Sequence, residues 1–315
     1  MTSKLSWRSL CTAIFIVIAA FLWWSGPAMA MSAPQNQPVI VLVPGFFNSL
    51  APGHVRTQPP FIFPYFSGTI VHTLQNYGTV VTVNTLMPVG TVEQNGEILG
   101  RFLAATAMQY PGRQMILVAH SAGGLYSMWA LTNRPDLPVR TVLTIATPYG
   151  GVEMVDNIAT QVKPLDTLAL YMNLESLRQF KKSKVAALLA GFRLPENVRW
   201  IALAGSQPPC SLLACGDSRN LSWILTLAQM LMKNSSDGIV TVDSALARNI
   251  GVRGSSGGPF RFEAWHDLNF ALEHWEMVED SRLFKVLGIV NTGHIHDMQR
   301  RLFEQIFDRL GQPRL

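Results

Sequence analysis

Charged residues are scarce in this sequence. Asp, Glu, Lys and Arg make up 14% of its 315 residues, and the formal net charge is only +5. The densest basic cluster, KKSK at residues 181–184, is short enough to be the solvated face of a helix. Because the chain has no extended basic run that would contact phosphate groups, we expect no nucleic-acid partner.

Cysteine is scarce too, with three in the chain. Cys210 and Cys215 lie close together in PPCSLLACGD, and no further metal-ligating residues surround them. We therefore expect neither a metal site nor a cofactor. In an oxidising compartment this pair would form a local disulfide, whose small loop gives modest stabilisation; two free thiols are the alternative.

Long apolar runs are missing beyond the N-terminal region. There, Lys4 and Arg8 precede an apolar segment at residues 10–24, and SGPAMA ends in a small-x-small site at residues 28–30. The apolar run is shorter than the roughly 20 residues that span a bilayer. We interpret residues 1–30 as a signal peptide cleaved after Ala30, which predicts export to the periplasm or beyond. An uncleaved membrane anchor is the alternative.

The remaining residues, 31–315, alternate short apolar runs with longer helical stretches. This alternation predicts an α/β domain whose mostly parallel central sheet carries helices on both faces. The expected strands lie at residues 38–44, 79–86, 114–120, 139–148, 198–205 and 260–265.

Two helical stretches interrupt this rhythm, at residues 150–199 and about 209–236. We interpret both as insertions that form a cap or lid above the strand ends, with ordinary core-packing helices as the alternative. Because the cap segments are partly apolar, we expect them to favour a lipid-like substrate and to allow transient contact with a membrane surface.

A serine stands at one junction between an expected strand and an expected helix. The apolar run at residues 114–120 leads into AHSAGG, so that Ser121 is followed by Ala122, Gly123 and Gly124. A sharp turn at this point would expose the hydroxyl, and its strained backbone requires small neighbours. The pattern favours Ser121 as a nucleophile.

These features resemble the α/β-hydrolases, specifically the bacterial lipases and esterases. AHSAGG resembles their G-x-S-x-G turn, with Ala119 in place of the first glycine. VIVLVPGFFNS resembles their first-strand oxyanion loop, VLTIATPYGG a segment after a later strand, and SSDGIVTVDSA the segment that carries the acid. The resemblance implies an oxyanion hole formed by the backbone N–H groups of Phe46 and Ala122.

The family order of serine, acid, then histidine points to Asp237 as the acid. Asp237 follows turn-forming residues and precedes an apolar run. Asp243 is the alternative, although its position before SALAR favours a helix cap.

Three of the histidines that follow Asp237 are candidates for the base. We prefer His266 as the base, because it comes directly after an expected strand, and keep His274 and His294 as alternatives. His120 is not expected to be the base, since the side chains of neighbours in such a turn diverge.

The resemblance implies a serine hydrolase that cleaves carboxylic esters through an acyl-enzyme on Ser121. The expected signal peptide adds export, and the apolar cap segments add a preference for an apolar acyl chain. Two alternatives stay open. An alcohol could replace water as the acceptor, which would make the protein an acyltransferase. The fold could also have lost its activity and serve as a binding protein.

Overall fold

The computed structural model describes residues 37–46, 65–153, 155–156, 175–206, 235–268, 272, 274, 277–278 and 292–314. All of them belong to the second of two compact units, Gln37–Leu315. The expected signal peptide and the Cys210–Cys215 pair lie outside the described residues.

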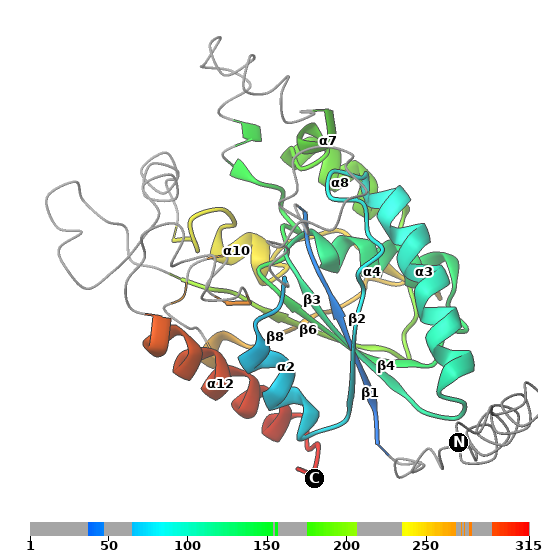
Figure 1. Ribbon diagram of the computed structural model, residues 1–315. Coiled ribbons are helices and arrows are strands. Elements are labelled where there is room, and N and C mark those ends of the chain that lie inside the picture. The colour runs from blue at the N-terminus through cyan, green and yellow to red at the C-terminus, as the bar shows by residue number, and fades with distance from the viewer. Residues whose placement is uncertain are drawn as a thin grey trace, which may run out of the picture. The chain divides into compact units, whose positions relative to one another are not determined.

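A parallel sheet forms the centre of this unit, with six strands in the order β2-β1-β3-β4-β6-β8 (Figure 1). The strands are β1 (Val39–Val43), β2 (Thr79–Thr82), β3 (Met115–His120), β4 (Val139–Ile145), β6 (Arg199–Leu203) and β8 (Glu263–Ala264). Each lies within one of the predicted runs and is shorter than it, with the largest differences at β2 and β8. The expected fold class, a mostly parallel sheet between helices, is confirmed.

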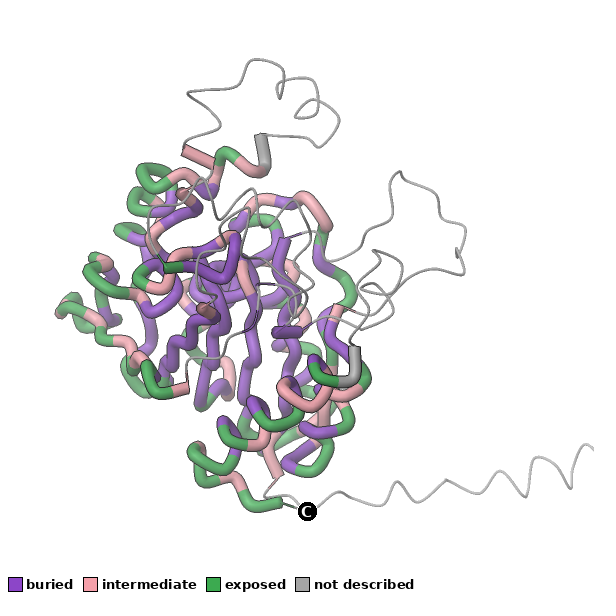
Figure 2. Tube along the Cα trace, turned by 90° about the vertical axis from the view of Figure 1, so that its left-hand side faces the viewer, coloured by how far each residue is buried: buried purple, intermediate pink, exposed green. Residues whose placement is uncertain are grey.

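Helices cover both faces of the sheet. One face carries α3 (Val92–Gln109) and α4 (Ala122–Asn133), and the other carries α2 (Gly68–Gln75) and α12 (Thr292–Arg309). Strand β1 is buried at every residue because it contacts both layers. Val39, Val41 and Val43 pack with α3 and α4, whereas Ile40 and Leu42 pack with α2 and α12, as the period of two in a strand requires. Figure 2 shows the strands buried and the outer surfaces of the helices exposed.

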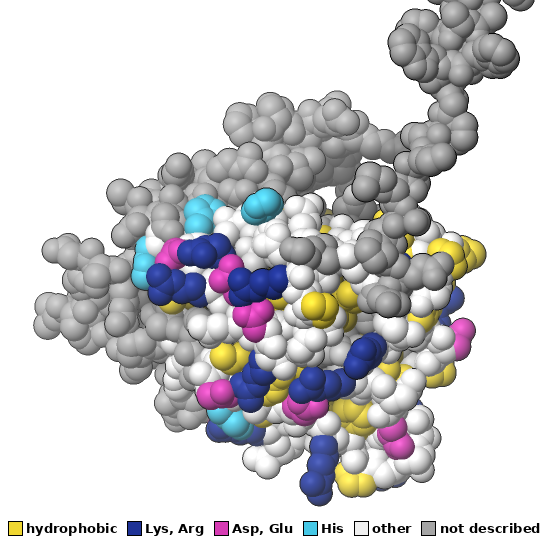
Figure 3. Space-filling model, turned by 90° about the horizontal axis from the view of Figure 1, so that it is seen from below, with side chains coloured by type: hydrophobic (Ala, Val, Ile, Leu, Met, Phe, Trp, Pro, Cys, Tyr) yellow, Lys and Arg dark blue, Asp and Glu magenta, His cyan; other side chains and the backbone are white. Residues whose placement is uncertain are grey.

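The helices begin where their sequences provide caps. Thr91 forms a capping box with Gln94 at the start of α3. Ser67 caps α2 and also donates a hydrogen bond to Gln299 of α12, which joins the two helices of that layer. Helix α12 buries Phe303 and Phe307 against the sheet. Its other side carries ion pairs, and basic and acidic side chains lie next to one another on the face in Figure 3.

The segment predicted as a first insertion contains α7 (Glu175–Arg178), α8 (Lys182–Gly191) and β5 (Arg193–Leu194). Val185 and Leu189 of α8 are buried in the same core as α3 and α4, so α8 is a packing helix of the sheet domain. Residues 157–174 and 207–234 lie outside the described residues, and the cap itself stays a prediction.

The shorter elements follow on the later half of the chain. They are β7 (Arg253–Gly254), which pairs with β5, the helix α10 (Val242–Ala245) and the 3-10 helix η1 (His266–Leu268). Within the part of the chain that the structure describes, no helix has the length and apolarity needed to cross a membrane.

The close approach of α4 to the end of β1 gives a stability prediction. In Gly123→Ala, the new methyl group would lie 2.6 Å from the carbonyl oxygen of Val43 and 2.8 Å from that of Pro44. Because both are backbone atoms, the helix has to shift, and we expect the free energy of unfolding to fall by about 1–3 kcal/mol.

Gly68→Ala is the matched control, since nothing lies within 4 Å of an added methyl group at this helical position. We expect it to be neutral or slightly stabilising, because alanine favours a helix by up to about 1 kcal/mol over glycine. Urea unfolding of both variants makes the comparison. Equal stability of Gly123→Ala and the parent protein would contradict this packing.

Candidate active site

Ser121 occupies the turn between β3 and α4 with a strained backbone. Its φ of 54° and ψ of −130° lie in a region that non-glycine residues rarely adopt. Three hydrogen bonds hold it there. Its N–H donates to Ile145 over 2.8 Å, and its carbonyl accepts from the Thr147 hydroxyl at 2.9 Å and from the Gly124 N–H at 3.1 Å. The turn is therefore fixed by β4 and by the segment after it.

The loop after β1 lies against this turn. A Cβ atom on Gly45 would come 2.7 Å from the Cβ of Ser121, so only glycine allows this approach. Phe46, the next residue, packs its ring edge-on against Phe180 with centroids 5.4 Å apart. Ala122 is the first residue of α4, where a backbone N–H has no partner within the helix. Both expected oxyanion donors therefore belong to segments adjacent to Ser121.

Asp237 is fully buried in a tight turn. Its Oδ1 accepts hydrogen bonds from the backbone N–H groups of Ile239 and Val240, at 3.0 and 2.8 Å. Its Oδ2 lies 2.8 Å from Nδ1 of His274. With three hydrogen bonds, the carboxylate is held in one orientation despite its burial.

The structure pairs Asp237 with His274 and not with the preferred candidate, His266. His274 is 2% exposed, and its backbone N–H also donates to the Asp237 carbonyl at 3.0 Å. His266 is exposed at the start of η1, where its Nδ1 lies 3.0 Å from a guanidinium nitrogen of Arg248. His294 is exposed near the start of α12.

The reason for this difference is the path of the chain after β8. The strand ends at Ala264, earlier than the expected end at residue 265, and the chain turns into η1 at the surface. It returns to the core at Leu272 and again at Met277 and Val278, which are buried among α2 and α12. The Val278 carbonyl also accepts from the Ser67 N–H at 2.7 Å. This return brings His274 to Asp237.

The imidazole of His120 contacts that of His274, with ring centroids 4.6 Å apart. His120 is the last residue of β3 and is fully buried. Burial lowers the pKa of His120 well below its usual range, and the nearby His274 ring adds to this lowering. The contact places the Asp237–His274 pair beside the residue that precedes Ser121.

Asp243, the alternative acid, and Asp267, which lies next to His266, both have other partners. Asp243 forms an ion pair with Arg248 at 2.5 Å in the first turn of α10, and Thr241 is the cap of that helix instead of Asp243. Both carboxylate oxygens of Asp267 accept from Arg309. Among the described residues, no group of three or more His, Cys, Asp or Glu side chains could hold a metal ion.

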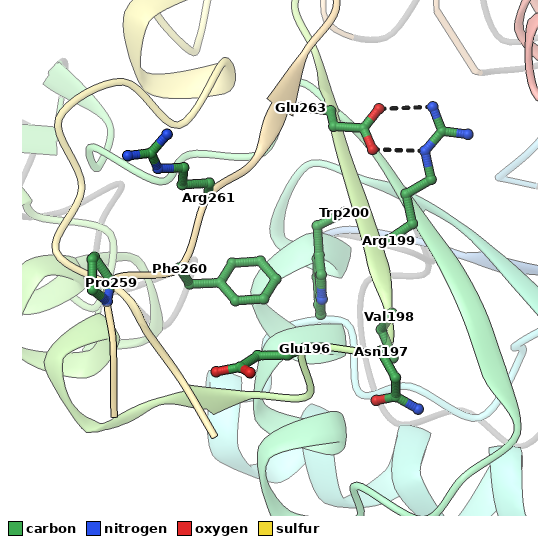
Figure 4. Close-up of a pocket in the computed structure, with 9 residues that line it drawn as sticks. All are labelled: Glu196, Asn197, Val198, Arg199, Trp200, Pro259, Phe260, Arg261 and Glu263. Atoms are coloured by element: carbon green, nitrogen blue, oxygen red, sulfur yellow. Dashed lines mark hydrogen bonds and ion pairs between the residues drawn. The ribbon is translucent and has the colours of Figure 1, made fainter. Parts of the chain in front are cut away.

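A separate hollow of about 440 Å³ lies at the start of β6 and β8 (Figure 4). Phe260 faces Trp200 across it, and Arg199 forms two hydrogen bonds of 2.7 Å with Glu263 at its edge. Because the strands are parallel, this hollow is at the opposite end of the sheet from Ser121. Ligands of open α/β sheets bind at the carboxyl ends of the strands, so the serine end is the candidate active site.

Comparison with known proteins gives the fold a context. No family model matches the sequence, and no curated protein shows significant similarity to it. The fold is similar to that of the mature lipase BlEst2 from Bacillus licheniformis, with a TM-score of 0.57 and 17% identity over 88% of this chain and 93% of that one.

Two further solved structures are similar to a comparable extent. The metagenomic carboxyl esterase MGS0156 gives a TM-score of 0.58 and 17% identity over 87% of this chain and 76% of that one. The Staphylococcus hyicus lipase gives 0.57 and 14% over 88% and 96%. From the parallel sheet, the serine turn and these three similarities, we conclude that the chain has the α/β-hydrolase fold found in bacterial lipases and esterases.

Proposed function

We propose that the protein is an exported serine hydrolase that cleaves carboxylic esters through an acyl-enzyme on Ser121. The observation that carries this proposal is the buried hydrogen bond between Asp237 and His274, whose imidazole lies against His120. A buried carboxylate that orients an imidazole close to a strained serine turn is the arrangement that activates a hydroxyl nucleophile.

In the proposed reaction, the base is His274 in place of His266. The Ser121 oxygen attacks the ester carbonyl carbon while Nε2 of His274 takes the hydroxyl proton. Asp237 stabilises the resulting imidazolium through Nδ1. The tetrahedral oxyanion accepts hydrogen bonds from the N–H groups of Phe46 and Ala122, a contribution worth roughly 10²–10³ in rate for each donor.

Collapse of this intermediate transfers the proton from His274 to the leaving alcohol and forms the acyl-serine ester. Water, deprotonated by His274, then attacks the acyl carbon and releases the acid. The proposed preference for an apolar acyl chain rests on the sequence of the two insertions, and export rests on residues 1–30. A series of p-nitrophenyl esters of increasing chain length tests the acyl preference.

Ser121→Ala tests the nucleophile. We expect it to lower kcat for p-nitrophenyl esters by at least about 10⁴-fold and to abolish labelling by a fluorophosphonate, because no other hydroxyl occupies the turn. Ser127→Ala is the matched control. Ser127 lies six residues further on, within α4, and its hydroxyl donates to the Gly123 carbonyl. Labelling that persists in Ser121→Ala would overturn the proposal.

The three histidines give a second test. We expect His274→Asn to lose turnover about as completely as Ser121→Ala, because the two residues act as one unit. His266→Asn and His294→Asn should retain most of the activity, since both side chains are exposed and neither contacts Asp237 among the described residues. Steady-state assays of the three variants decide. Loss of turnover only in His266→Asn would return the role of base to that residue.

Asp237→Asn tests the acid. The asparagine amide has one acceptor oxygen, which cannot replace both carboxylate oxygens toward the backbone N–H groups and the Nδ1 proton of His274. The imidazole is then no longer held in the tautomer with its proton on Nδ1, and we expect kcat to fall by about 10²–10⁴-fold. Asp243→Asn removes a carboxylate six residues later that pairs only with Arg248 among the described side chains, and it should leave kcat within about twofold. Similar kcat values for both variants would contradict the assignment.

A further inference from the structure

A buried histidine adjoins the proposed catalytic residues without a role in the reaction as derived above. His120 ends β3, a strand whose other residues, Met115–Ala119, are all apolar and buried. A polar imidazole in such a strand costs desolvation energy that an apolar side chain would avoid. This choice of residue requires a reason beyond the filling of the core.

The His120 imidazole contacts aromatic rings from two distant segments. Its centroid lies 4.6 Å from that of His274 and 5.7 Å from that of Tyr65. Its Nδ1 lies 2.6 Å from the Tyr65 hydroxyl, and its Nε2 is buried without a hydrogen-bond partner among the described residues. When the hydroxyl donates to Nδ1, the ring proton of a neutral His120 is on Nε2.

Tyr65 connects this imidazole to the oxyanion loop. A Cβ atom on Gly45 would lie 2.8 Å from the Tyr65 hydroxyl oxygen, 2.7 Å from the Ser121 Cβ and 2.9 Å from the His120 carbonyl oxygen. The Tyr65 hydroxyl, the loop before Phe46 and the serine turn therefore form one tightly packed group. The His274 ring, which contacts that of His120, completes this group.

We infer that Tyr65 and His120 are a positioning pair that holds the His274 imidazole in the plane required to reach both Ser121 and Asp237. Asp237 fixes the Nδ1 atom of His274, but one hydrogen bond leaves the ring free to tilt. The His120 ring restricts this tilt, and the Tyr65 hydroxyl in turn fixes the orientation of His120. The inference rests on the proposed function, because it assigns the pair to the same base.

Neutrality of His120 is part of this role. Among the described residues, His274 contacts the Asp237 carboxylate and the His120 ring, and the Tyr65 hydroxyl contacts His120. A cationic His120 would oppose the imidazolium that forms on His274 during attack. Complete burial keeps His120 neutral, so it supports the ring sterically without repelling its charge.

Tyr65→Phe and His120→Phe test the inference. Tyr65→Phe removes only the hydroxyl. His120→Phe retains an aromatic ring but removes the hydrogen bond with the Tyr65 hydroxyl. Misplacement of a catalytic group by a fraction of an ångström reduces chemistry more than binding. We expect each variant to lower kcat and the rate of fluorophosphonate labelling by about 10-fold or more, while KM changes by less than about threefold.

Tyr77→Phe is the matched control. Tyr77 is more deeply buried than Tyr65, and its hydroxyl donates to Asp308 of α12 at 2.8 Å. We expect this variant to lose some stability in a thermal melt but to keep its kcat. A general structural effect of losing a buried hydroxyl would lower kcat in both tyrosine variants in proportion to the folded fraction.

The outcomes separate the two proposals. If Tyr65→Phe folds and keeps the kcat and labelling rate of the parent, the positioning role is overturned, whereas loss of activity in Ser121→Ala and His274→Asn still supports the hydrolase. If those two variants stay active, the proposed function fails, and the positioning role fails with it. Should His120→Phe not fold, Tyr65→Phe alone decides.

Discussion

The buried hydrogen bond between Asp237 and His274 is the interaction on which the candidate site depends. A carboxylate with no solvent exposure is unfavourable unless its oxygens are satisfied, and here two backbone N–H groups and one imidazole satisfy them. The turn at Ile239 and Val240 thus fixes the carboxylate, and the carboxylate fixes the imidazole. Because His274 also donates its backbone N–H to the Asp237 carbonyl, the two segments are joined by main chain and side chain together.

The serine turn is constrained from the opposite side. Ser121 keeps a positive φ because its backbone is hydrogen-bonded to Ile145, the last residue of the neighbouring strand β4, and to Thr147, two residues later. Gly123 allows the helix to rest on the carbonyls of Val43 and Pro44. Strain at one residue is therefore stabilised by hydrogen bonds and close packing from two adjacent strands.

Most of the sheet could be predicted from the sequence, because strands buried on both faces appear as short continuous apolar runs. Strand β1 is such a run between prolines, and Ser121 stands out because three small residues follow it. Asp237 could also be predicted, since turn formers precede it and an apolar run follows it. These features are local, and local sequence is sufficient to indicate them.

The histidine that pairs with Asp237 could not be predicted, because the choice depends on where the chain returns to the core. His266 follows a strand, as expected of the base, but β8 contains only Glu263–Ala264, and the His266 side chain lies exposed in η1. The apolar pair Met277–Val278, three and four residues after His274, anchors that segment and was the available indication. The contact of His120 with His274 is equally non-local, and sequence reasoning missed it.

A crystal structure of the protein after reaction with a phosphonate ester would show whether Ser121, His274 and Asp237 act together. We expect phosphorus bonded to Oγ of Ser121, with the phosphonyl oxygen within about 3.2 Å of the N–H groups of Phe46 and Ala122. We also expect Nε2 of His274 within hydrogen-bond reach of the Ser121 oxygen while Nδ1 keeps its contact with Asp237. An adduct on another residue, or a His274 imidazole out of reach of Ser121, would contradict this expectation.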